Sequence, residues 1–543
     1  MLNTFNLLIP DLFEIYNVIA FIMLIYTFSF FGNIISNEKS LSINFLIGWS
    51  SFLTIFHVYI LFFNHKLFIF FYAYLSVFII LFLFLLLKKK NIFKIKVNNY
   101  RNYYFLIPLL LILISMKSFG WDSFAFHLPR LDEVILNNEL PIERYRSNYP
   151  FTITILYYFT NIITGSFTEN LPAIFEFILL ILSCAIILEI LKKKINIKFI
   201  YPLVFLAVFF NPIIMNVYSY SIYEDFTVSF VILVTIFFLY EKQFCLHEFT
   251  YKTCFTLGLI LSLLSICKIT GIVHVYLILF GIFIINLKKI DFLILKKLFF
   301  ITIIANLNFG LWSYHIFHNE IFVAKEITGF RIEIFENLLN AFYQQLLQKK
   351  NLLISVILIP LLTIYSLLKK SLLTKNNLNL LIVTSTLIIG WLTFLIFWTV
   401  FMQTFSNAYV LHDLPRYMSQ LSLIITLCWI ILLTNFFKNY LEMLNKLLFK
   451  HFFAFVFVFL TFAAFYEIRR DLQPLILDAN KIVSQIKKEE TLNVFISGTN
   501  SSYLKEILRY RMKNKIKILR NKNETIDYIH IEYKNPSFKI FKK

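Results

Sequence analysis

Apolar runs long enough to cross a lipid bilayer recur along most of this chain, from Leu12 to Phe465. A spanning helix needs about 20 such residues, and lipid accepts a chain only when its backbone polar groups are bonded internally, as they are in a helix. Hydrophobic residues make up 59% of the sequence, against roughly 45–50% in an ordinary soluble domain. We therefore expect an integral membrane protein with no water-soluble domain before Arg470.

The apolar runs predict an all-α polytopic fold with about fourteen spans. The expected spans are residues 12–35, 41–63, 67–87, 103–117, 170–191, 199–217, 225–240, 254–267, 271–287, 293–315, 351–368, 378–403, 418–437 and 450–467. From Thr491 onward the pattern changes to a strand, an amphipathic helix and two more strands. These are Leu492–Ser497, Tyr503–Met512, and two strands near Ile516–Leu519 and Ile526–Tyr533. Residues 468–543 are thus expected to form a small extracytoplasmic α/β domain.

The net charge of +20 sits in short bursts between apolar runs. Examples are Lys88–Lys90, Lys192–Lys194 and Lys288–Lys289. This is the pattern of cytoplasmic loops rather than of a nucleic-acid surface. With these bursts inside, the segment after residue 117 and the carboxyl tail lie outside, provided that Phe151–Gly165 lies in the interface instead of crossing.

The cysteine spacing and the amino-terminal sequence argue against a disulfide framework, a zinc site and a removable signal peptide. The five cysteines fall in or beside apolar runs without paired spacing, which predicts neither a disulfide framework nor a zinc site. No basic region precedes the first apolar run and no small-residue cleavage pattern follows it, so we predict no removable signal peptide.

The first outer loop opens with GWDSFAFHLPRLDEVILNNELP. Pro129 suits the first turn of a helix whose apolar face carries Leu128, Leu131 and Ile135. That helix would lie on the membrane surface and hold Asp122 and His127 at the lipid boundary, where a carboxylate can act as a general base. The alternative is that Asp122 is only an interfacial residue at a helix start.

A second acidic pair, Glu224 and Asp225, stands at the start of a later span on the same outer face. Acidic residues there are costly unless they are paired, solvated or functional, so the two sites favour a shared polar cavity. A helix cap by Asp225 is the alternative.

Cations could complete such a site. Lys268, beside Gly271, interrupts an apolar stretch and could bind a phosphate, or simply reach toward water at a turn. Arg416 and Tyr417 stand where an outer loop enters a span, and arginine suits phosphate oxygens. His315 and His318 could in principle share a metal, but no acidic cluster accompanies them.

In their order, the stretches WDSFAFHLPR, NYPFTITILYYFTNIITG, YED, CKITG and PRY resemble the GT-C superfamily of polytopic glycosyltransferases. They are most similar to the branch with protein O-mannosyltransferases and the lipid A aminoarabinose transferase. This resemblance covers roughly Lys117 to Tyr417. It implies a catalytic core over residues 103–467, extra membrane helices over 1–102, and a polyprenyl-phosphate sugar as donor.

Carried over by position, Asp122 resembles the catalytic base. Glu224 and Asp225 would orient the acceptor or a bound cation, and Lys268 and Arg416 would steady the leaving lipid phosphate. His127, Arg130 and Tyr417 would support the site. The resemblance leaves the sugar, the acceptor and any divalent metal open. The first loop departs from the mannosyltransferases, which have adjacent acidic residues where this chain has Trp-Asp-Ser.

Two rival functions remain. A transporter or flippase of lipid-linked sugars would need the spans and the cations but no base at the outer surface; it would often show repeats and polar groups near the bilayer midplane, which this sequence lacks. A glycan polymerase or ligase would have an outer loop rich in Arg and His, whereas His318–Lys350 has only Arg331 among arginines.

Overall fold

The computed structural model describes most of the chain. The described residues are 12–63, 66–88, 100–120, 123–141, 149–192, 201–211, 220, 224–321, 340, 343–344, 347, 350–369, 373–402, 414–436, 443, 447–486, 492–498, 500–512, 516–519, 529–534 and 537–542. Asp122, the predicted base, lies outside these residues.

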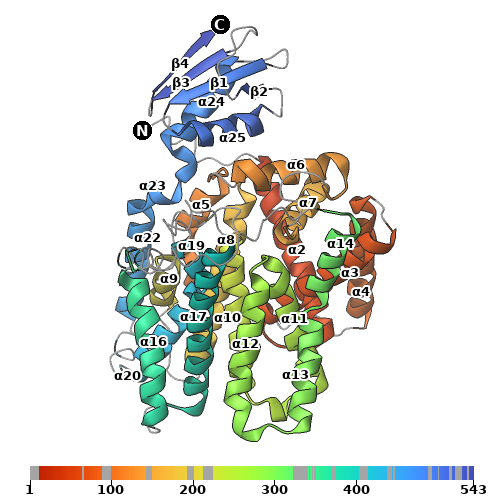
Figure 1. Ribbon diagram of the computed structural model, residues 1–543, viewed down its shortest axis with the longest axis vertical. Helices are drawn as coiled ribbons and strands as arrows, with labels where there is room; N and C mark the ends of the chain where they lie inside the picture. The colour runs from red at the N-terminus through yellow and green to blue at the C-terminus, as the bar shows by residue number, and fades with distance from the viewer. Residues whose placement is uncertain are drawn as a thin grey trace.

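Helices dominate the structure (Figure 1). They are α2 (Leu12–Ser36), α3 (Leu41–Phe63), α4 (Leu67–Leu87), α5 (Ile107–Ile114), α6 (Leu128–Asn137), α7 (Thr152–Thr164), α8 (Leu171–Lys192), α9 (Tyr201–Phe209), α10 (Asp225–Glu241), α11 (Tyr251–Cys267), α12 (Gly271–Asn286), α13 (Phe292–Ala305), α14 (Leu307–His318), α16 (Lys350–Leu368), α17 (Lys375–Met402), α19 (Leu414–Ser419), α20 (Ser422–Phe436), α22 (Leu447–Ala463), α23 (Phe465–Ile468) and α24 (Pro474–Ile486). A short π-helical turn, η2 (Ser123–His127), leads into α6.

Among the described residues, 7 helices are long and apolar enough to cross a membrane. An eighth span results if α13 and α14, which meet at a 42° bend, count as one. Every segment predicted to span contains a helix, but several of these helices, such as α5 and α9, are short. The chain thus has the helices of a polytopic membrane protein, and the count of fourteen spans stays a prediction.

The connections between helices gather at the two ends of the helical bundle. The connection from α12 to α13, which carries Lys288 and Lys289, and the connection from α16 to α17 lie at one end (Figure 1). Helices α6 and α7 and the carboxyl-terminal sheet lie at the opposite end. This arrangement matches the loop pairing expected from the basic bursts, although which side of a membrane each end faces remains a prediction.

Residues 118–170, expected to be outside the membrane and called the first outer loop here, pack onto the bundle through α6 and α7. Helix α6 buries Leu128 and Leu131, as expected from the sequence, and Val134, whereas the expected Ile135 is only partly buried and Leu136 is exposed. Helix α7 is covered more completely than an interfacial helix with one lipid face would be, because Thr152 through Thr160 are all buried. Its neighbours include α2, α4 and α6.

The residues after α24 form a four-stranded sheet flanked by helices. Strands β1 (Leu492–Gly498), β2 (Ile516–Leu519), β3 (Ile529–Lys534) and β4 (Ser537–Lys542) lie in the order β2-β1-β3-β4. Strand β1 is parallel to β2 and β3, and β4 is antiparallel to β3. Helix α25 (Ser501–Arg511) follows β1. The sequence prediction lacked β4.

Helices α2 and α3 approach each other at two glycines. A Cβ on Gly32 would lie 1.8 Å from the Asn44 carbonyl oxygen, and one on Gly48 would lie 1.8 Å from the Phe28 carbonyl oxygen. Both neighbours are backbone atoms of the opposite helix, so they cannot move away as a flexible side chain could. The two backbones can pack this closely only because both positions lack a side chain, as at small-residue interfaces between membrane helices.

We predict that Gly48→Ala destabilises the protein by about 1–3 kcal/mol or more, because overpacking forces the helices apart. Gly310→Ala is the matched control, since a Cβ there meets no atom within 4 Å. The measurement is thermal unfolding in detergent. Equal midpoints for the two variants would contradict the close packing of α2 on α3.

Candidate functional site

The candidate site is built around Asp225, the first residue of α10, whose side chain is 2% exposed. Its Oδ1 accepts hydrogen bonds from Lys268 Nζ at 2.5 Å and from Gln420 Nε2 at 2.6 Å. Its Oδ2 accepts one from Arg416 Nε at 2.8 Å. Both oxygens are therefore held by donors, two of them cationic, which is what a buried carboxylate requires.

Lys268 reaches Asp225 because the chain turns sharply after α11. Lys268 has an extended backbone and ends α11, and its carbonyl oxygen accepts a hydrogen bond from Gly271 N, at the start of α12. A Cβ on Gly271 would lie 2.0 Å from the Leu264 carbonyl oxygen, so this turn needs a glycine. Lys268 is buried, at 7% exposure, with its Nζ 5.1 Å from the Tyr417 ring centroid. It does not simply extend into water.

Arg416 and Gln420 come from the entry into α20. Arg416 lies in α19, and Gln420 follows one helical turn later. Gln420 Oε1 is 2.8 Å from Nε2 of the fully buried His274, on α12. Trp391 of α17 packs on the His274 ring and donates its indole N–H to the Tyr417 carbonyl. These contacts fix the segment that presents Arg416.

A second ion pair joins this cluster to the first outer loop. Arg130 Nη2 lies 4.0 Å from Glu224 Oε1, and both side chains are buried. Arg130 also donates to the Pro150 carbonyl and to Thr154 Oγ1. Thr152, the first residue of α7, donates its hydroxyl to the Ile266 carbonyl near the end of α11. The loop is thus bound to both sides of the site.

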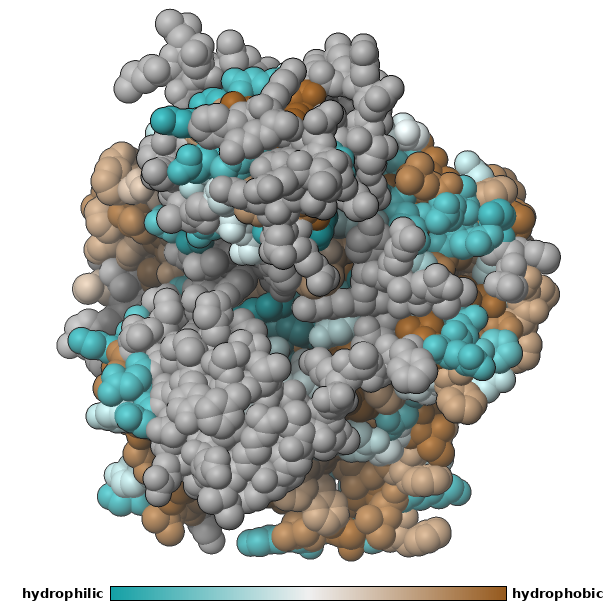
Figure 2. All heavy atoms as spheres, turned by 45° about the horizontal axis from the view of Figure 1, so that its top comes forward, coloured by the Kyte–Doolittle hydropathy of each residue, from teal (hydrophilic) through white to brown (hydrophobic). Residues whose placement is uncertain are grey.

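The five charged residues do not cancel. Three cations (Arg130, Lys268, Arg416) and two carboxylates (Glu224, Asp225) leave a formal charge of +1. Arg416 is the most accessible of them, with 16% of its side chain exposed. Hydrophilic residues also lie in a depression near the centre of this end of the molecule (Figure 2). A buried excess of positive charge suits an anion.

The structure brings together most of the residues predicted for the site. Glu224, Asp225, Lys268, Arg416, Tyr417 and Arg130 form one contact network. His127 is half-buried in η2, one turn before Arg130. No group of three or more His, Cys, Asp or Glu residues that could hold a metal occurs in the described part of the chain. His315 instead contacts Asn319 and the Trp312 ring.

Sequence reasoning missed Gln420 and His274. Gln420 follows Arg416 by four residues, so helical periodicity alone places both on one face. His274 is the only titratable residue other than tyrosine within α12. A polar residue inside an apolar span is a signal that could have identified it.

Comparisons with known proteins add nothing to these observations. Neither the protein-family models nor the curated proteins nor the solved structures give a match to this chain. The resemblance seen in the sequence motifs therefore stays a hypothesis, and the site must be interpreted from its own geometry.

We predict that Asp225→Ala destabilises the protein by about 3–5 kcal/mol, because it leaves two cations without their buried counter-ion. Removing Glu139, whose ion pair with Lys66 is about half exposed on both sides, should cost at most about 1 kcal/mol. Thermal unfolding of Asp225→Ala and Glu139→Ala in detergent makes the comparison. Similar losses would mean that Asp225 is not the buried centre of the cluster.

Proposed function

We propose that this protein is a membrane glycosyltransferase that transfers a sugar from a polyprenyl-phosphate donor to an acceptor on the outer face of the membrane. The observation that carries the proposal is the buried cluster of Asp225, Lys268 and Arg416, with its excess of positive charge under the first outer loop. The acceptor, whether protein, lipid or glycan, and the sugar itself are left open.

The cluster suits the leaving group of such a reaction. As the bond from the anomeric carbon to the phosphate oxygen breaks, its electron pair stays with the lipid phosphate, whose charge rises. Lys268 and Arg416 would stabilise that charge at a site largely shielded from water, where fixed cations are most effective. The membrane helices would accommodate the prenyl chain.

Asp122 would supply the other half of the chemistry. Its carboxylate takes the proton of the acceptor hydroxyl while the hydroxyl oxygen forms the new bond to the anomeric carbon. One bond forms, one breaks, and the proton ends on Asp122. The motif resemblance assigns this role, and the sequence places Asp122 in the loop that Arg130 attaches to the cluster.

Asp225 has a different part in this proposal from the one expected by resemblance. Because both of its oxygens are engaged by Lys268, Gln420 and Arg416, it would orient the two cations rather than the acceptor. A divalent cation at Asp225 would have to displace these donors. The rival flippase function would use the same cations to bind the phosphate without any bond being broken.

The decisive measurement follows release of lipid phosphate from radiolabelled polyprenyl-phosphate sugars by detergent-purified protein. We expect Asp122→Asn to lose turnover while donor binding survives, because the amide cannot accept the hydroxyl proton. Both proteins must first be shown to be folded and to bind donor. If neither turns over donor and both move it across liposomes, the flippase function replaces the transferase.

Lys268→Met tests the phosphate site. We expect turnover to fall by about 10²-fold, the usual loss when one charge-stabilising donor is removed, while Arg416 and Gln420 still hold Asp225. Lys242→Met, which removes a partly exposed partner of Glu38 on the far end of α10, is the control. Unchanged turnover in Lys268→Met would exclude this lysine from the reaction.

A further inference from the structure

Three backbone N–H groups just before Asp122 are all bound by side chains from other parts of the chain. Lys117 N donates to Asp471 Oδ2 at 3.2 Å, Ser118 N to Glu169 Oε2 at 3.2 Å, and Gly120 N to the Tyr503 hydroxyl at 2.8 Å. Gly120 has φ +92°, a conformation that favours glycine. Three backbone N–H groups of residues 117–120 are therefore fixed by hydrogen bonds, and the segment includes a glycine with positive φ.

Helix α25 of the carboxyl-terminal unit makes one of these contacts and supports a second. Tyr503 supplies its hydroxyl directly. Arg511, two turns further along, forms a two-pronged ion pair with Glu169, including Arg511 Nη2 to Glu169 Oε2 at 3.0 Å. The Arg511 guanidinium also lies 5.6 Å from the ring centroid of Phe124, which packs against Tyr503 and Tyr510. Helix α25 thus binds the chain on both sides of Asp122.

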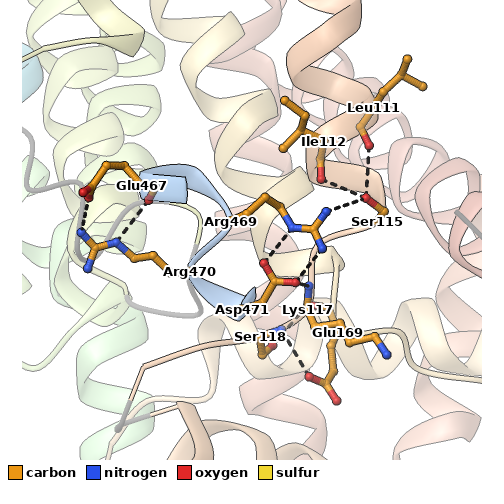
Figure 3. A network of polar contacts seen from close by, with 10 residues as sticks. All are labelled: Leu111, Ile112, Ser115, Lys117, Ser118, Glu169, Glu467, Arg469, Arg470 and Asp471. Atoms are coloured by element: carbon orange, nitrogen blue, oxygen red, sulfur yellow. Dashed lines mark hydrogen bonds and ion pairs between the residues drawn. The ribbon is translucent and has the colours of Figure 1, made fainter. Parts of the chain in front are cut away.

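The third contact comes from the connection between α23 and α24 (Figure 3). Asp471 is held by the buried Arg469, whose Nε and Nη2 donate to its two oxygens at 2.8 and 2.9 Å. Arg469 Nη1 also donates to Ser115 Oγ at 3.1 Å. The carboxylate that accepts Lys117 N is therefore fixed to the end of α5, and the contact does not depend on exposed, mobile side chains.

We propose that the carboxyl-terminal unit positions the first outer loop for catalysis, with Tyr503 and Arg511 as positioning residues. The inference rests on the proposed function, because it assigns these residues an effect through Asp122. None of the three acceptors belongs to the Asp225 cluster. Loss of one should therefore misplace the loop while leaving the cations that receive the donor phosphate intact.

The hydrogen bond from Gly120 N to the Tyr503 hydroxyl does not depend on pH near neutrality. Burial raises the pKa of Tyr503 to about 12, so its hydroxyl is neutral when it accepts the Gly120 N–H. The test can therefore be run at the pH that suits turnover.

The experiment compares the full-length wild type, Tyr503→Phe and Arg509→Ala in detergent. Arg509 is on the same helix but pairs only locally with Glu506, at the surface. For Tyr503→Phe we expect faster hydrogen exchange at Lys117–Gly120 and a fall of about tenfold in kcat with the donor KM unchanged, since small misplacements of a reacting group are costly. Arg509→Ala should match the wild type in all three.

Unchanged exchange in Tyr503→Phe, or equal effects from Arg509→Ala, would overturn the proposal. So would faster exchange with an unchanged kcat, which would make the contact structural only. Arg511→Lys, which keeps the charge beside Glu169 without the two-pronged geometry, replaces Tyr503→Phe if that variant does not fold. If the wild type turns over no donor, the proposed function fails, and exchange alone decides whether α25 holds the loop.

Discussion

The burial of Asp225 is the constraint on which the arrangement of this end of the molecule depends. A carboxylate side chain that is 2% exposed in an apolar helical bundle is stable only if cations and hydrogen-bond donors surround it. These donors come from the end of α11, from α19 and from the turn between α19 and α20. The three segments must therefore meet at the first turn of α10, and residues separated by up to 195 positions form one site.

The need of a buried carboxylate for a cation also explains why the loop after α5 packs against the start of α10. Glu224 adjoins Asp225 and is also buried, so it needs a cation of its own, which the loop provides as Arg130. Arg130 in turn satisfies the carbonyl groups of Tyr149 and Pro150 and stacks on Phe151. The electrostatic demand of the bundle thus fixes the position of the loop predicted to carry the base.

The sequence predicted the helical membrane fold, two of the three residues of the buried face of α6, and most members of the candidate site, because these follow from apolar periodicity and from charges placed at span ends. It did not predict that Asp225 would bind Lys268 and Arg416 at once, since the pairing of side chains from distant spans leaves no local pattern. The close contact of Gly48 with the Phe28 backbone could not be predicted either, because a single glycine in an apolar helix does not indicate which neighbour it packs against. The burial of α7 depends on its neighbours, and its own composition predicted only an interfacial helix.

The contact between the carboxyl-terminal unit and the first outer loop is the feature that the sequence was least able to predict. The amphipathic pattern of α25 predicted a helix with one buried face, but Tyr503 and Gly120 are 383 residues apart. The first outer loop is consequently held at two places that flank Asp122 in the sequence: Gly120, two residues before it, and Arg130, eight residues after it. One attachment leads to the carboxyl-terminal unit and the other to the cationic cluster. A loop fixed at both points loses conformational freedom before any substrate binds, so Asp122, if it is the proposed base, would have less entropy to lose in the reaction.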